Sequence, residues 1–342
     1  MTRARPAIPL EVWVGLYLLL YLPNVMVTRW VTTTPHARLG RPLTGIETLP
    51  ASLILSMVMT YLFIWLSGWY RDANTVQFAG KRFPFPTKHT FISGIGTALI
   101  LFTVPLSFTI RDVSIPFMQL LMRGDILLIA PVVDFMFGRR VRWWSWTALV
   151  MVLAALALTL FNRGGFHLPP IAIVTIVLYT LGYFVRLAVM NRISKTGDPA
   201  SVRRYFVEEK VIALPLSVLA LAVLAASGIG GPADELYWGF VGVWTDPVIL
   251  DIFFIGLTLT LISIVSIIIL LNPQENAYCV PLERAASLLA GVGGSVLLAL
   301  YWGGDMPRDS ELIGAGILIA AIVLLSVAPR ISRTARAPRV SL

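Results

Sequence analysis

The feature of this sequence that most constrains its fold is a set of long apolar stretches without lysine, arginine, aspartate or glutamate. Nine such stretches occur, at Val12–Thr28, Thr48–Tyr70, Thr90–Ile110, Trp143–Asn162, Gly164–Val185, Val211–Ala233, Ile252–Gln274, Ala285–Gly304 and Leu312–Pro329. A helix needs roughly 20 consecutive, mostly apolar residues to cross the hydrocarbon core of a bilayer. Each stretch therefore predicts one transmembrane helix.

A tenth apolar segment, from Ile115 to Phe137, differs from the others because it contains Arg123, Asp125 and Asp134. When it is counted as a span, every connection is short and no soluble domain remains. Composition agrees, since 57% of the 342 residues are hydrophobic and only 13% are charged, whereas soluble domains carry about 25% charged residues. We therefore expect an all-α membrane protein with about ten transmembrane helices.

The basic residues, which give the chain a net charge of +9, are unevenly distributed over the predicted loops. If the N-terminus is cytoplasmic, 18 of them fall on the cytoplasmic side and 6 on the other. Such a bias sets the orientation of membrane proteins, so both termini are expected in the cytoplasm. The charge then reflects orientation and contact with anionic membrane lipids, and no nucleic-acid partner is expected. The predicted location is a bacterial inner (plasma) membrane.

A tyrosine pattern occurs twice in the chain. Tyr17 and Tyr21 recur 162 residues later as Tyr179 and Tyr183. Further matches at this spacing, or one residue less, are Glu47 with Glu209, Gly94 with Gly256, and Arg123 with Arg284. The pattern predicts two repeats of five helices, 1–162 and 163–329, followed by a basic cytoplasmic tail, 330–342. Because each repeat has an odd number of helices, the second copy is inverted in the membrane, as in many transporters.

This architecture resembles the drug/metabolite transporter superfamily. The resemblance is best near the end of each half, at Phe137-Gly138-Arg139-Arg140 with Trp146, and at Trp302-Gly303-Gly304-Asp305. Two branches are similar, the EamA-like exporters and the nucleotide-sugar and triose-phosphate transporters. In the latter, basic residues in the fourth and ninth helices meet phosphates, which here implies Arg123 and Arg284. The resemblance also allows a homodimer with contacts through the fifth and tenth helices.

Arg123 and Arg284 draw attention on physical grounds as well. A charged side chain near the middle of a bilayer costs at least ~2.5–3.5 kcal/mol on insertion scales and normally faces a cavity, a partner or a substrate. A planar guanidinium recognises a carboxylate or phosphate through two hydrogen bonds. One interpretation is that both arginines bind an anionic substrate. The other is that each is neutralised by a nearby acid, namely Glu283, Asp125 or Asp134. These three acids are also the candidate proton carriers.

A second group of candidate substrate-binding residues lies on two predicted helix faces. Tyr17, Tyr21 and Asn24 are spaced four and three residues apart, and Tyr179, Tyr183 and Arg186 repeat that spacing. Residues at this spacing share one face of a helix. A polar stripe on an apolar helix is expected to face the bundle interior and line a substrate cavity. The alternative is anchoring at the membrane boundary, where tyrosine is common.

Enzymatic chemistry finds little support in the sequence. The three histidines, His36, His89 and His167, are scattered without metal-ligand spacing, so we expect no catalytic residue, metal or cofactor. We expect a secondary active transporter that moves a small polar metabolite, with an anion favoured, by alternating access. One alternative is an exporter of amino acids or amphipathic drugs in which the arginines are structural. The other is a membrane protein that is not a transporter, such as a lipid scramblase or an assembly factor.

Overall fold

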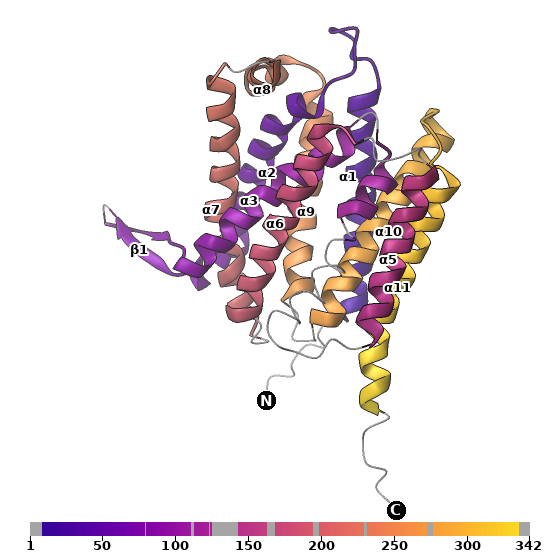
Figure 1. The fold of residues 1–342 in the computed structure, drawn as a ribbon. Coiled ribbons are helices and arrows are strands. Elements are labelled where there is room, and N and C mark those ends of the chain that lie inside the picture. The colour runs from indigo at the N-terminus through magenta and orange to yellow at the C-terminus, as the bar shows by residue number, and fades with distance from the viewer. Residues whose placement is uncertain are drawn as a thin grey trace, which may run out of the picture.

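The computed structural model describes residues 9–78, 80–110, 113–122, 124, 143–162, 168–193, 198–228, 231–271 and 276–334. Its long helices are α1 (Leu10–Thr33), α2 (Gly45–Ser67), α3 (Lys88–Thr109), α5 (Trp143–Asn162), α6 (Pro170–Ile193), α7 (Pro199–Ala226), α9 (Ile249–Leu270), α10 (Asn276–Trp302) and α11 (Asp309–Thr334). Each of the nine charge-free stretches falls largely on one of these helices. They form a single bundle, and α11 extends beyond the other helices at its C-terminal end (Figure 1).

Within the described part of the chain, seven helices are long and apolar enough to cross a membrane. They are α1, α2, α3, α6, α7, α9 and α10. The chain is therefore a multi-pass α-helical membrane protein. In the predicted tenth segment, residues 115–122 are helical. Arg123, Asp125 and Asp134 lie outside the described residues.

Two predicted loops contain regular structure that the apolar pattern did not indicate. Between α2 and α3 lie a short 3-10 helix, η1 (Trp69–Asp72), and an antiparallel hairpin of β1 (Thr75–Phe78) and β2 (Lys81–Pro84). The stretch Ser227–Pro247 carries α8 (Gly231–Val241) and η2 (Gly242–Thr245). Both segments are too short to span a bilayer, so a search for transmembrane runs passes over them.

Helix α7 begins at Pro199, twelve residues before the charge-free stretch that predicted it. Asp198 explains the early start, because its carboxylate accepts hydrogen bonds from the backbone NH groups of Ala200 and Ser201. Proline is also favoured at the first helical position, because an NH group there would have no partner within the helix. The added turns carry Glu208, Glu209 and Lys210 into the structure as buried residues.

The helices of the two halves interlock. Helix α3 packs against α6 and α7, whereas α9 packs against α1 and α2, and α5 packs against α11. The contact between α3 and α6 is close because glycines face each other, and a Cβ added to Gly96 would lie only 2.7 Å from the carbonyl oxygen of Gly182. Small residues let membrane helices approach in this way. The packing brings polar side chains from α3, α6 and α7 together in the bundle.

Candidate functional site

A buried ion pair joins α6 to α7. The Arg186 Nε donates to Glu209 Oε1 at 2.8 Å and its Nη2 to Oε2 at 3.4 Å. The two side chains are 5% and 0% exposed. Two charges taken out of water are tolerated only when they are paired and further hydrogen-bonded. The surroundings of the carboxylate therefore decide whether this pair is stable.

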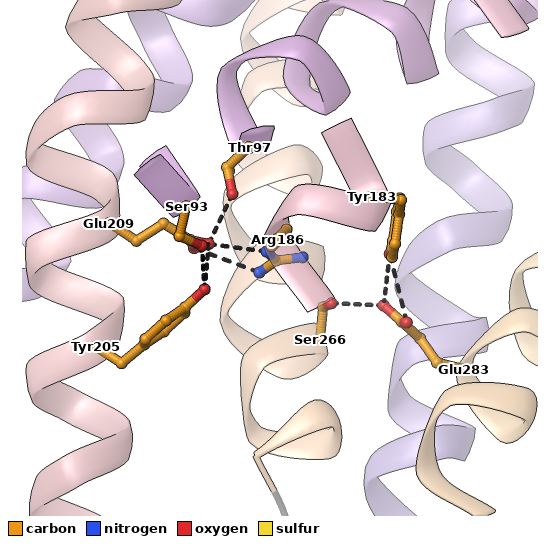
Figure 2. Close-up of polar contacts among 8 residues, drawn as sticks. All are labelled: Ser93, Thr97, Tyr183, Arg186, Tyr205, Glu209, Ser266 and Glu283. Atoms are coloured by element: carbon orange, nitrogen blue, oxygen red, sulfur yellow. Dashed lines mark hydrogen bonds and ion pairs between the residues drawn. The ribbon is translucent and has the colours of Figure 1, made fainter. Parts of the chain in front are cut away.

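Several hydroxyl groups surround the Glu209 carboxylate (Figure 2). Thr97 and Ser93, one turn apart on α3, donate to Oε1 at 2.6 and 3.2 Å, and Tyr205 donates to it at 3.1 Å. The Tyr205 and Ser93 hydroxyls are also within hydrogen-bonding reach of each other, and when that bond forms, one of the two donates to the other instead of to Glu209. Tyr205 precedes Glu209 by four residues, so the two share a face of α7. Three helices thus contribute donors to one carboxylate, which stabilises its ionised form.

A second buried acid, Glu283, lies at the start of the membrane-spanning part of α10. Ser266 on α9 donates to Glu283 Oε1 at 2.5 Å. The Tyr183 hydroxyl on α6 lies 3.5 and 3.4 Å from the two carboxylate oxygens. Glu283 is therefore tied to both neighbouring helices, and through Tyr183 it is one turn of α6 away from Arg186 (Figure 2).

The neighbouring Arg284 side chain is fully buried among aromatic rings. Its guanidinium carbon lies 3.4 Å from the centroid of the Tyr183 ring, and an Nη atom donates to the Tyr179 hydroxyl. The faces of aromatic rings attract cations, and the two tyrosine rings lie 5.0 Å apart between centroids. The rings thus hold the guanidinium inside the bundle.

The α6 stripe predicted from spacing is therefore buried in the structure. Tyr179, Tyr183 and Arg186 project toward α10 and α7, and together they connect the Glu209 cluster with Glu283 and Arg284. We call this connected set, Ser93, Thr97, Tyr179, Tyr183, Arg186, Tyr205, Glu209, Ser266, Glu283 and Arg284, the central polar cluster. Its acids are groups that carry protons, and its arginines are groups that bind anions through paired hydrogen bonds.

The equivalent stripe on α1 is also buried, and it ends in a neutral residue, Asn24. Tyr17 and Tyr21 stack with centroids 5.4 Å apart. Asn24 Nδ2 donates to the carbonyl oxygen of Ile255 at 3.2 Å and to Thr258 Oγ1 at 2.8 Å, both on α9. The candidate residues on α1 thus face the bundle interior rather than the membrane boundary.

Sequence reasoning placed Arg186 in the site but did not identify its partner. Glu209 was recognised only as the repeat match of Glu47. Its position before Val211 put it in a charged loop between two predicted spans. The signal that locates it is Asp198-Pro199, a helix start. Ser93, Thr97, Tyr205 and Ser266 carried no signal of their own, since isolated hydroxyl residues are common in membrane helices.

Comparisons with known proteins describe the fold alone. No family model matches the chain, and no curated protein matches it. One solved structure, described only as the crystal structure of a protein, matches with a TM-score of 0.53 at 13% sequence identity. The match covers 94% of this chain and 99% of that one. The chain thus shares its fold with a protein of solved structure over almost its whole length.

Proposed function

We propose that this protein is a secondary active transporter that moves a small polar, anionic metabolite by alternating access. The observation that carries the proposal is the central polar cluster, in which two arginines and two glutamates are buried in one apolar bundle. Ionisable groups inside a membrane are costly, and they usually mark a substrate or ion pathway. Arg284, with Arg123 as its match in the first half, is the proposed anion-binding pair.

We further propose that the chain has ten spans in two inverted repeats, with both termini in the cytoplasm of a bacterial cell. The helix contacts support this arrangement. The third helix of the first half, α3, packs on α6 and α7, the first two helices of the second half. In return α9, the third predicted span of the second half, packs on α1 and α2. Asn24 and Arg186 are equivalent residues of the two repeats. Asn24 on α1 donates a hydrogen bond to Thr258 on α9, in the other half. Arg186 on α6 donates to Glu209 on α7.

The same arrangement supports membership in the drug/metabolite transporter superfamily, which we propose on the resemblance at the end of each half. Proton coupling through Glu283 or Glu209 fits the cluster, since each is a buried carboxyl group hydrogen-bonded to a hydroxyl group of a neighbouring helix. Asp125 and Asp134 remain further candidates for this role.

Transport is tested with the purified chain in sealed vesicles, using panels of phosphorylated, carboxylated and cationic solutes. We expect uptake of a phosphorylated or carboxylated solute, and its loss in Arg284→Ala and Arg123→Ala with the folded protein still in the membrane. Arg71→Ala, which changes an exposed arginine in η1, is the matched control and is expected to keep transport. Movement of labelled lipid without any solute would contradict the proposal.

The second candidate function is export of amino acids or amphipathic drugs. The observation that favours it is that Arg186 already binds Glu209 through two nitrogens, as a structural arginine does. Under this function a cationic or zwitterionic solute is transported, and Arg284→Ala leaves its rate unchanged. The solute panel therefore separates the two candidates.

A further inference from the structure

The β1–β2 hairpin projects sideways from the helix bundle (Figure 1). Its strands pair in the register Val76 with Phe83 and Gln77 with Arg82. Pairing continues past the strands, because the NH of Phe85 donates to the carbonyl of Asn74 at 2.7 Å. The segment is therefore an ordered element with a defined pair of faces.

One face of the hairpin is apolar and uncovered. Val76 and Phe83 are opposite each other, and Phe85 follows Phe83 by two residues, so the three side chains share a face. Their exposed fractions are 45%, 50% and 56%. A sheet face of this kind in water would be unfavourable, which indicates that something other than water covers it.

The base of the hairpin is fixed to the first turns of α7. The Glu208 carboxylate accepts hydrogen bonds from the Asn74 backbone and side chain at 3.1 and 2.8 Å, and from Thr90 at 2.8 Å. Arg203 forms an ion pair with Asp72 at 2.5 Å. These contacts hold the hairpin at one level relative to the bundle.

That level corresponds to the edge of the membrane. The apolar part of α7 begins at Val211, and the preceding turns carry Arg203, Arg204 and Glu208. Charged residues next to an apolar span mark the headgroup region. We expect an element that projects sideways at this level to meet lipids, with Phe83 and Phe85 toward the upper part of the acyl chains.

The hairpin region is also basic. Strand β2 carries Lys81 and Arg82, and Arg71 and Lys88 flank the two strands. The one acidic residue between Arg71 and Lys88, Asp72, is paired with Arg203. An apolar face beside an excess of basic residues is the combination that binds anionic membrane surfaces.

We infer that the β1–β2 hairpin is a binding surface for anionic lipid headgroups, with Val76, Phe83 and Phe85 inserted at the interface and Lys81 and Arg82 supplying the charge. This lipid surface is separate from the central polar cluster and does not depend on which solute the protein carries. Each basic residue near an anionic bilayer is expected to change lipid affinity about fivefold.

The test uses the full chain with Cys279, its single cysteine, replaced by alanine. A new cysteine at Val76, an exposed position on the apolar face of the hairpin, carries a fluorophore that reports polarity. The protein is reconstituted into phosphatidylcholine vesicles with and without about one third phosphatidylglycerol. We expect quenching by lipids spin-labelled near the headgroup, several-fold stronger with the anionic lipid. Added salt is expected to reduce the difference, because it screens surface charges.

The matched variants separate the effect of charge from the effect of side-chain shape. Lys81→Gln with Arg82→Gln is expected to remove the dependence on anionic lipid, whereas Lys81→Arg with Arg82→Lys is expected to keep it. Equal quenching in both kinds of vesicle would overturn the role of charge. No quenching in either would overturn lipid as the occupant and indicate a protein partner. Both of these outcomes are measured on the labelled protein that keeps Lys81 and Arg82, so the test does not depend on whether the charge variants fold.

Discussion

The first and second halves of the molecule place the same stripe of residues on equivalent helices but connect it differently. On α1 the stripe ends in Asn24, which binds a threonine and a carbonyl group on α9. On α6 it ends in Arg186, which binds Glu209 on α7. A neutral amide is sufficient to join helices here, so packing alone does not require a buried charge. Helix packing alone therefore does not explain the charged junction on α6.

The largest expected effect comes from breaking the charged junction on one side. Glu209→Ala leaves Arg186 buried without its carboxylate, and removal of one partner of a buried ion pair costs about 3–5 kcal/mol. We expect that loss in the free energy of unfolding, measured in mixed detergent micelles, together with loss of transport. Glu47→Ala, the repeat-equivalent change, breaks a pair with the half-exposed Arg41 and removes the capping box at the start of α2, so it is expected to cost about 1–2 kcal/mol. Equal costs for the two variants would contradict the distinction between the halves.

Removing both charges at once separates stability from function. Replacement of a buried ion pair by apolar residues of similar volume is often neutral or stabilising. The double variant Arg186→Met with Glu209→Leu is therefore expected to recover stability to within about 1–2 kcal/mol of the parent. Transport is expected to stay absent, measured on the same vesicles. Full transport by the double variant would mean that the ion pair only holds helices together.

The neutral junction is expected to tolerate change better. Asn24→Ala removes the two hydrogen bonds from Asn24 to α9. The Ile255 carbonyl then accepts hydrogen bonds only from groups of its own helix. The expected cost is about 1–2 kcal/mol of unfolding free energy, with transport retained at reduced protein yield. The measurement pairs a micelle unfolding curve with a vesicle assay normalised to folded protein. Complete loss of transport in Asn24→Ala would place the α1 stripe in the functional site as well.

The smallest expected effect is at a charged contact outside the spans, where Asp246 meets His36 at 2.7 Å and Arg38 at 3.6 Å. Burial raises the pKa of Asp246, but the Val248 NH, His36 and Arg38 outweigh burial and hold this pKa below its ordinary value of 3.8. The contact therefore stabilises the fold above about pH 4 and loses its effect as pH falls through the lowered pKa.

Asp246→Asn is expected to flatten this dependence, with a cost of about 1 kcal/mol or less at neutral pH. The measurement is the unfolding temperature of the parent and the variant between about pH 3 and pH 7. A parent protein whose stability rises on acidification would contradict the assignment.

Sequence reasoning located nearly all the long helices because apolar length is a strong signal that tertiary contacts cannot hide. It located the stripes on α1 and α6 because helical spacing alone decides which residues share a face. It did not find the α7 start, because a search for charge-free runs stops at Glu209 and Lys210, whose charges are buried by contacts far apart in sequence. The hairpin was missed because its strands have only four residues each, and the contacts that hold its base, from Glu208 to Asn74 and Thr90, join residues far apart in sequence.

Glu208 and Glu209 are consecutive residues, and the consequence is mechanical. Successive side chains on a helix diverge by about 100°. The same turn of α7 therefore binds the base of the hairpin through Glu208 and Arg186 through Glu209. A rotation of α7 large enough to release the arginine would also strain the bonds to Asn74 and Thr90. Rotation of α7 therefore couples the hairpin at the side of the bundle to the central polar cluster, so neither contact can change without the other.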